Sequence, residues 1–218
     1  MAVLELKETE PSTPKDLFGS ETNQPQHIAR VLWNAVDDVL NYEDENLAFA
    51  ITGAPGIGKT TIANMIAVRL TGSRFAVDTE NGKDVGVQRV RDMKMEMHNS
   101  SLFSTTGHRC WIINEGDKIT DDGQVAFLSL LDEQPTKFHV LVTSNEELDD
   151  WSERFHSRFE VYNIEAPCID DISAGLTGRL DVDPRVGQAA AEQCGGNVRQ
   201  AIKEINAWKR KNKPLKLL

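Results

Sequence analysis

The sequence predicts an α/β fold: a parallel five-stranded sheet flanked by helices and followed by a small three-helix lid domain. Three observations predict it. Short apolar runs alternate with amphipathic helical stretches as far as residue 164, which is typical of parallel strands joined by crossover helices. A glycine-rich loop follows the first of these runs and leads directly into a helical stretch. Beyond Pro167 there is no further strand candidate, and only helical periodicity remains.

The first element is expected to be a helix, because apolar residues recur at steps of three and one along residues 28–40. Residues 47–51 are expected to form the first strand, since they are apolar throughout, as a buried parallel strand is. The other expected strands are residues 75–78, 110–113, 138–143 and 160–164. The expected helices are residues 61–70, 85–98 and 124–133 in the sheet domain, and residues 170–180, 184–193 and 198–211 in the lid.

This order of elements divides the chain into three expected parts. Residues 1–16 are polar and acidic and contain two prolines, so they predict a flexible N-terminal arm. Residues 17–166 are expected to form the α/β domain, and residues 167–218 the helical lid with a basic C-terminal tail. The tail is interpreted as a solvated helix end in preference to a nucleic-acid contact.

Composition restricts the class of protein. The chain has 218 residues, of which 39% are hydrophobic and 27% charged, as in soluble globular proteins. Its net charge of -10 argues against a protein that coats nucleic acid by bulk electrostatics, because phosphates are neutralised by concentrated Lys and Arg. No apolar run approaches the roughly 20 residues of a membrane span, and the N-terminus does not resemble a secretory signal. A cytoplasmic protein is expected.

The glycine-rich loop predicts a site for the triphosphate of a nucleotide, expected to be ATP with Mg²⁺. Glycines let the backbone wrap closely around phosphates, and the helix that follows presents its positive dipole end to them. Lys59 would reach the β- and γ-phosphates, and the hydroxyl of Thr60 would hold Mg²⁺. The residues expected to bind nucleotide here are Gly53, Ala54, Pro55, Gly56, Ile57, Gly58, Lys59, Thr60 and Thr61.

Polar and acidic residues follow the expected strand at residues 110–113, where a carboxylate is needed to hold the magnesium shell. Asn114 occupies the position of that carboxylate; its amide can accept a hydrogen bond from magnesium-bound water but brings no negative charge. Glu115 stands where a general base would polarise the attacking water. Asp117 could partly replace the missing charge, or it could cap the next helix. The sequence thus predicts ATP binding, whereas the rate of hydrolysis depends on Asn114.

The motifs and their order resemble those of the AAA+ ATPases, and within them the small subunits of sliding-clamp loaders. Residues 76–91 resemble the strand, polar turn and Val-Arg helix of that family, and residues 114–128 resemble its Asp-Glu-Ala-Asp motif with the first Asp replaced. Three shorter motifs continue the resemblance: the strand ending at Asn145, the Ser157-Arg158-Phe159 sequence that is similar to Ser-Arg-Cys, and the Gly196-Asn-Val-Arg199 sequence that is similar to Gly-x-x-Arg.

The resemblance implies roles for three residues outside the glycine-rich loop. Asn145 would help to position the hydrolytic water, and Arg158 would reach into the ATP site of a neighbouring subunit. Arg199 would contact the γ-phosphate from the lid of its own subunit. With Lys59 and Glu115, these residues complete the expected catalytic set of a Mg-dependent ATPase that works as an oligomer with itself or with related AAA+ subunits.

The resemblance covers residues 17–211 and implies DNA, a sliding clamp, or both as partners. The collar domain that holds clamp-loader subunits in a ring is not visible after the lid. The expected function is therefore a clamp-loader-like ATPase in DNA replication or a related DNA transaction. Two alternatives stay open: an ATP-dependent switch or scaffold with little hydrolysis, because of Asn114, and a remodeller of protein clients.

Overall fold

The computed structural model describes residues 11–42, 46–97, 103–133, 135–145 and 148–212. Five parallel strands form one sheet in the order β2-β3-β4-β1-β5, which confirms the predicted parallel five-stranded sheet. The strands are β1 (Ala48–Gly53), β2 (Val77–Asn81), β3 (Arg109–Asn114), β4 (Phe138–Thr143) and β5 (Glu160–Ile164).

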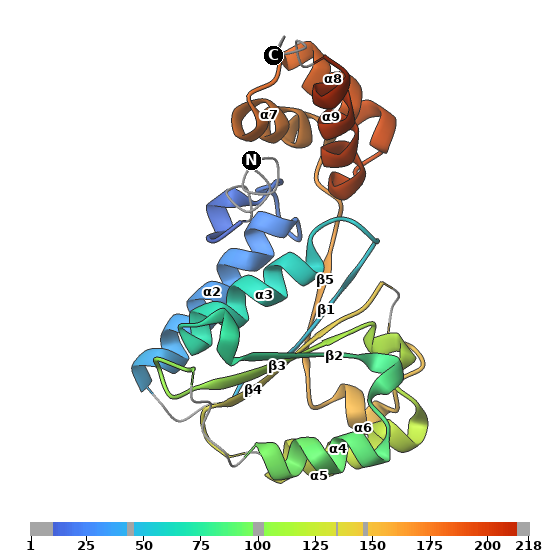
Figure 1. Cartoon of the computed structure of the whole chain (residues 1–218). Coiled ribbons are helices and arrows are strands. Elements are labelled where there is room, and N and C mark those ends of the chain that lie inside the picture. Colours follow the sequence, from blue (N-terminus) through green and yellow to red (C-terminus); the bar gives the residue numbers. More distant parts are fainter. Residues whose placement is uncertain (1–10, 43–45, 98–102, 134, 146–147, 213–218) are drawn as a thin grey trace, which may run out of the picture.

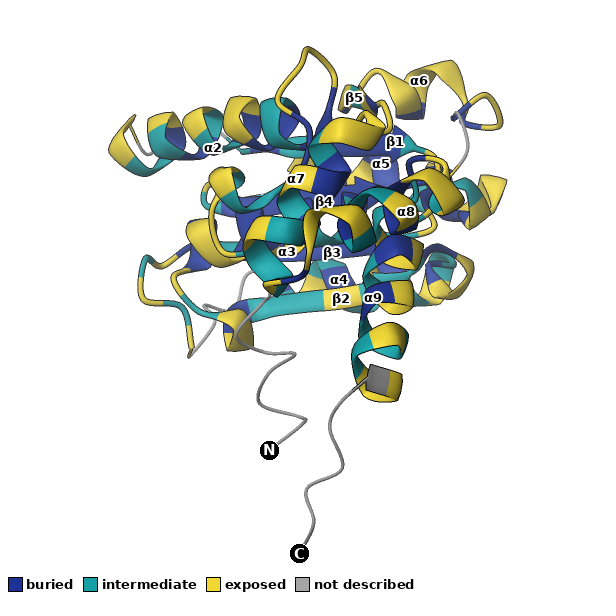
Figure 2. Cartoon of the chain, turned by 90° about the horizontal axis from the view of Figure 1, so that it is seen from above, coloured by how far each residue is buried: buried dark blue, intermediate teal, exposed yellow. Residues whose placement is uncertain are grey.

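Helices cover both faces of the sheet, and the central strands are buried between them (Figures 1 and 2). The side chains of each central strand alternate between two apolar clusters: Cys110 and Ile112 of β3 pack with one helix layer, and Trp111 and Ile113 with the other. The first layer is α2 (Pro25–Tyr42) and α3 (Lys59–Thr71), and the second is α4 (Val87–Glu96), α5 (Asp121–Glu133) and α6 (Glu153–His156).

The structure corrects the expected start of the second strand and of the helix after it. Arg74–Ala76 form a 3-10 turn, η2, and β2 begins only at Val77. The turn forms because the Ser73 side chain accepts a hydrogen bond from the Phe75 N–H at 3.2 Å, and Phe75 is left 75% exposed. Helix α4 begins at Val87, after a short 3-10 turn, η3 (Gly82–Asp84), and the residue at 98 lies outside the described part of the chain.

Helix α5 begins three residues earlier than expected, at Asp121. Thr120 explains the early start, because its hydroxyl accepts a hydrogen bond from the Gly123 N–H at 3.2 Å, as an N-cap residue does. A further 3-10 turn, η4 (Gly116–Lys118), joins β3 to this helix. Because β1 and β3 both run parallel to β4, the polar residues after β3 lie at the same end of the sheet as the glycine-rich loop.

The lid consists of three helices that follow β5: α7 (Ile169–Leu180), α8 (Pro184–Cys194) and α9 (Val198–Asn212). They bury a small apolar core of their own, which includes Ile172, Leu176 and Ala201. The lid stands at one end of the α/β domain, beside the N-terminal segment (Figure 1). It therefore overlies the end of the sheet where the glycine-rich loop lies.

Part of the N-terminal segment is described and contacts the lid. Pro14–Asp16 form the 3-10 turn η1, which is closed by the Asp16 carboxylate accepting hydrogen bonds from the N–H groups of Ser12 and Thr13. The guanidinium of Arg179 in α7 donates to the Asp16 carbonyl oxygen. Residues 1–10 of the expected arm lie outside the described residues, and the boundaries of arm, α/β domain and lid stay predictions.

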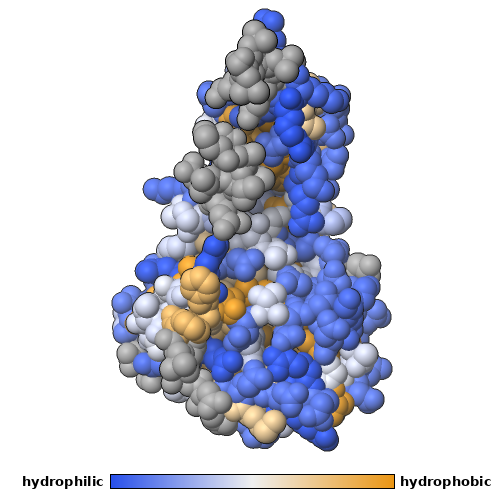
Figure 3. Space-filling view, viewed as in Figure 1, coloured by the Kyte–Doolittle hydropathy of each residue, from blue (hydrophilic) through white to orange (hydrophobic). Residues whose placement is uncertain are grey.

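The face of the molecule seen in Figure 3 is largely hydrophilic, with smaller apolar areas among the hydrophilic side chains. None of the helices in the described part of the chain is long and apolar enough to cross a membrane.

Candidate nucleotide-binding site

The glycine-rich loop runs from the end of β1 to the start of α3, and two of its glycines are required by geometry. Gly53 and Gly56 have φ angles of +138° and +84°, which residues with a Cβ adopt rarely. A Cβ on Gly53 would lie 2.3 Å from the Ile164 carbonyl oxygen, and a Cβ on Gly56 would lie 2.2 Å from the Asn197 Oδ1. Glycine therefore lets this loop pack closely against both β5 and the lid.

Lys59, the first residue of α3, is held inside the loop. Its Nζ donates hydrogen bonds of 2.7 Å to the carbonyl oxygens of Gly53 and Ala54, and the residue is only 6% exposed. Burial above all, and then the neighbouring Arg199, lower the pKa of Lys59 to about 8, while Asp117 acts in the opposite direction. An anion bound in front of Lys59 would stabilise the charged form of this side chain.

The ends of β3 and β4 form the wall opposite the loop. The Oδ1 of Asn114 accepts hydrogen bonds from two hydroxyls, Thr143 at 2.9 Å and Thr60 at 3.3 Å. Asn114 thereby links β3, β4 and the start of α3 at one point. Asn145 follows β4 and, with Thr143 and Ser144, lines a polar cavity between this wall and the loop. Thr143 and Ser144 were not predicted from the sequence as site residues. Their position directly before Asn145 was the signal that could have identified them.

Glu115 is exposed and has a left-handed backbone conformation, with φ 57° and ψ 53°. Its Oε2 accepts a hydrogen bond of 3.1 Å from the side-chain amide of Asn81, the last residue of β2. The carboxylate is thus held by the neighbouring strand while it lines the cavity. Sequence reasoning missed Asn81, because the contact joins the ends of two strands that are far apart in the chain.

The Asp117 carboxylate already has two partners near the cavity. Its two carboxylate oxygens accept from the Ser144 hydroxyl at 2.9 Å and pair with Lys118 at 2.7 Å. Burial on its own would raise the pKa of Asp117, but the hydrogen bonds from Lys118 and Ser144 outweigh it and lower that pKa below its ordinary value. Asp117 therefore stays ionised, with its charge largely balanced by Lys118.

The lid reaches the loop through the start of α9. The Arg199 N–H donates to the Gly56 carbonyl oxygen at 3.0 Å, and the Asn197 side-chain amide donates to the Pro55 carbonyl oxygen at 3.3 Å. The Arg199 side chain is exposed and lines the cavity. A change in the lid angle would therefore move Arg199 relative to Lys59.

Together these parts surround a polar cavity of about 220 Å³ that is open to solvent. Lys59 and Arg199 supply positive charge to it, and hydroxyl and amide groups supply most of the remaining polar surface. Such a cavity suits a polyanion. It is lined by Gly56, Gly58, Lys59, Thr60, Asn114, Glu115, Thr143, Ser144, Asn145 and Arg199.

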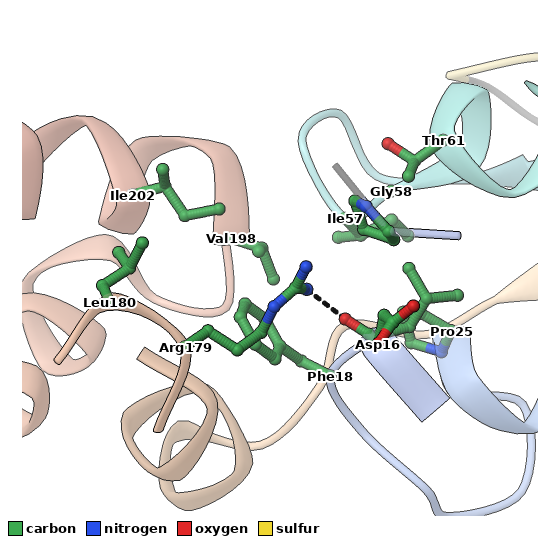
Figure 4. A pocket seen from close by; sticks show the side chains of 12 residues that line it. Asp16, Phe18, Pro25, Ile57, Gly58, Thr61, Arg179, Leu180, Val198 and Ile202 are labelled. Carbon is green, nitrogen blue, oxygen red and sulfur yellow. Dashed lines mark hydrogen bonds between the residues drawn. The ribbon is translucent and has the colours of Figure 1, made fainter. Parts of the chain in front are cut away.

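An apolar cavity of about 130 Å³ lies between the loop, the N-terminal segment and the lid (Figure 4). Phe18 lies under the Arg179 guanidinium, whose centre is 5.8 Å from the ring centroid. Its apolar walls are Leu17, Phe18, Pro25, Ile57, Leu180, Val198 and Ile202, and Thr61 also lines it. Gly58 lines both cavities, so the two adjoin at this residue.

Arg158 lines neither cavity. It lies just beyond α6, where its Nε donates a hydrogen bond of 2.8 Å to Asp132 in the last turn of α5. The Arg154 guanidinium approaches the same carboxylate at 4.0 Å. Arg158 is 39% exposed at its side chain, so it is accessible from outside the chain.

Residues 49–165, more than half of the chain, match the ATPase family associated with various cellular activities (AAA). No curated protein sequence matches the chain. The matched segment begins in β1 and ends after β5, and it contains the glycine-rich loop and the wall formed by Asn114 and Asn145.

Among solved structures, the chain is similar to RuvB of Thermotoga maritima, described as a Holliday junction branch migration motor, with a TM-score of 0.72 and 17% identity. Two point variants of the same RuvB superpose with a TM-score of 0.73 at 17% and 16% identity. The match with the RuvB motor covers 89% of this chain and 63% of RuvB, so the chain spans less than two thirds of that protein. At this level of identity the likeness shows the fold alone.

Proposed function

Because the chain belongs to the ATPase family associated with various cellular activities (AAA), we propose that it binds ATP across its two cavities and hydrolyses it as one subunit of an oligomer. The observation that carries this proposal is that a polar cavity with two cations and an apolar cavity meet at Gly58. ATP combines a polyanion and a flat apolar base in one molecule. The triphosphate would lie against Lys59 and Arg199, and the adenine against Phe18 and Ile202.

The residues around Asn114 fit a magnesium ion, which prefers oxygen ligands and keeps several waters. Thr60 would hold it through the hydroxyl, and Asn114 through a bound water. When bound, the ion would neutralise charge on the phosphate oxygens. Because Asn114 is neutral, the phosphates would contribute most of the negative charge around the ion.

For hydrolysis, we propose that Glu115 acts as general base and that Asn145 orients the attacking water. Asn81 holds the Glu115 carboxylate in the free chain, so this base would have to change partners before it acts. Arg158 would be supplied to the ATP site of a neighbouring subunit, since it lines neither cavity of its own chain. An arginine supplied in this way is worth about 10³ to 10⁵ in rate.

A DNA transaction is the proposed setting of this activity. The order of motifs resembles that of clamp-loader subunits, and the solved structures with a similar fold include a DNA branch migration motor. Clamp loading in replication is one specific form of the proposal, with a sliding clamp as the further partner. An ATPase assay with primed DNA or with a protein client tests this setting: stimulation by primed DNA would support a DNA partner, and stimulation by a protein client alone would instead favour the remodeller.

ATP binding can be tested separately for the two cavities. Ile202→Asp places a charge in the apolar cavity, so we expect it to weaken ATP binding about tenfold, the effect of losing one apolar side-chain contact, and to leave tripolyphosphate binding unchanged. Lys59→Ala removes a cation from the polar cavity and should weaken the binding of both ATP and tripolyphosphate at least tenfold. Isothermal titration calorimetry measures all four affinities.

Lys203→Ala provides the matched control, because Lys203 is exposed on α9 and lines neither cavity. It should bind both ligands as the wild type does. Equal weakening of ATP and tripolyphosphate by Ile202→Asp would show that the base lies elsewhere. Unchanged ATP binding in Lys59→Ala would contradict the assignment of the polar cavity.

Phosphate release by the assembled chain tests hydrolysis and the role of Arg158 together. At concentrations where mass measurement shows an oligomer, Arg158→Ala should lower the rate by about a thousandfold, whereas Arg154→Ala, in the neighbouring helix α6, should not. An unchanged rate in Arg158→Ala would contradict the role in trans.

A second candidate function is an ATP-dependent switch, which the neutral Asn114 supports. Tight ATP binding with negligible phosphate release by the assembled wild type would favour this switch.

A further inference from the structure

Asn114 is a neutral side chain at the edge of the polar cavity, and its Oδ1 is held by two hydroxyls. The residue is half-buried at the end of β3, and its Oδ1 accepts from the hydroxyls of Thr143 and Thr60. A Thr60 hydroxyl that donates to Asn114 keeps its lone pairs for a cation. The neutral amide thus takes the structural place of a carboxylate without bringing a negative charge next to the phosphate site.

The charges around the polar cavity favour an anion even without a metal. Lys59 and Arg199 line it, and Glu115 is the only acidic side chain among the described residues that line it. The Glu115 carboxylate accepts from Asn81, and the nearby Asp117 is paired with Lys118. Two cations therefore face a site with one restrained carboxylate.

A carboxylate at position 114 would lie within a few ångströms of the triphosphate and would repel it strongly unless a divalent cation lay between them. An amide at the same place has no such repulsion. We propose that Asn114 makes ATP binding nearly independent of a divalent cation, so that this site accepts metal-free ATP. The inference rests on the proposed nucleotide site and specifies the ligand species that it takes.

Isothermal titration calorimetry with ATP, in excess MgCl₂ and in EDTA, tests this inference without relying on turnover. The wild-type Kd should differ by less than about threefold between the two media, whereas Asn114→Asp should bind at least about tenfold more weakly in EDTA than in MgCl₂. Asn114→Ala keeps the position neutral and should remain insensitive to EDTA. Asn41→Asp adds the same charge to an exposed residue in the last turn of α2 and should behave as the wild type does.

Wild-type binding that weakens tenfold or more in EDTA would overturn the inference, and so would an Asn114→Asp protein insensitive to EDTA. If Asn114→Asp fails to fold by circular dichroism, the wild-type and Asn114→Ala measurements decide the question alone. Failure of the proposed function gives a different result: the wild type would then bind ATP in neither medium, which would overturn both proposals.

Discussion

His139 is a buried titratable side chain at the opposite end of β4 from the nucleotide cavity. Its Nδ1 accepts a hydrogen bond of 3.0 Å from the Leu47 N–H, and its Nε2 lies 2.8 Å from the Nδ1 of His108. Because His139 Nδ1 is an acceptor, the neutral ring carries its proton on Nε2 and donates it to His108. Burial above all, and then His108, lower the pKa of His139 to about 3.

This pKa predicts acid lability. The folded protein resists protonation of His139 down to about pH 3, whereas an unfolded histidine takes up a proton below about pH 6.5. The free energy of unfolding therefore carries no penalty from His139 above about pH 6.5. As the pH falls from there toward 3, the unfolded state gains a proton that the folded state does not, and the free energy of unfolding falls by up to about 1.4 kcal/mol per pH unit. Urea unfolding should show the free energy of unfolding falling between pH 6.5 and 5. His139→Asn should have a flatter slope, and an identical slope would contradict the assignment.

At the residue scale, the residues of the spaced motifs can be compared with the cavity, although their roles stay predictions. The structure does place Lys59, Asn114 and Arg199 around one cavity. The sequence could not predict Asn81 as the partner of Glu115 or Thr143 as the partner of Asn114, because these contacts depend on which strands are neighbours and where each strand ends. Motif spacing identifies residues from their order along the chain. Side-chain partners at strand ends depend on the register between neighbouring strands, which motif spacing does not give.

At the scale of single elements, α6 is too short to be stable by itself and is held by aromatic packing. The Phe155 ring is fully buried and contacts Phe127, Trp151 and Phe159, with centroid separations of 5.8, 4.6 and 5.2 Å. Phe159 lies directly after Arg158, so the aromatic cluster fixes the backbone from which that arginine projects. Phe159, which stands where the similar Ser-Arg-Cys motif has a cysteine, thus has a packing role.

Phe155→Ala should therefore be strongly destabilising. Removing a fully buried phenylalanine costs about 3–5 kcal/mol, including the cavity left behind. The neighbouring His156 is exposed, so His156→Ala is the matched control and should change the free energy of unfolding by less than about 0.5 kcal/mol. Chemical denaturation measures both. A loss below about 1 kcal/mol in Phe155→Ala would show that the cluster relaxes around the gap.

The elements themselves were largely predictable, because apolar periodicity reports which side of a segment is buried. The shift of β2 to Val77 was not, since a single Ser73 side chain caps a 3-10 turn over residues that are apolar enough to read as a strand. The early start of α5 has a similar cause in Thr120. Local side-chain to backbone hydrogen bonds decided these boundaries, and periodicity does not detect them.

At the scale of the whole molecule, the order of sheet domain and lid follows from the sequence, but the way they meet does not. In the lid, Asn197 and Arg199 donate hydrogen bonds to the glycine-rich loop. Arg179 of the lid donates one to the N-terminal segment. The apolar cavity exists only because these three parts of the chain come together (Figure 4). No pattern in the sequence predicted that the N-terminal segment would form one of its walls.

The contact between the lid and the N-terminal segment can be tested with two glycines of α7. A Cβ on Gly175 would lie 2.1 Å from two ring carbons of Phe18, whereas a Cβ on Gly178, one turn later, meets no atom within 4 Å. Gly175→Ala must therefore displace Phe18 from the apolar cavity, and we expect it to weaken ATP binding about tenfold with tripolyphosphate binding unchanged. Gly178→Ala should bind as the wild type does and should be slightly more stable, since alanine favours a helix by about 1 kcal/mol over glycine. Wild-type ATP affinity in Gly175→Ala would mean that Phe18 is not part of the base site, and a loss shared by both variants would point to an effect on α7 as a whole.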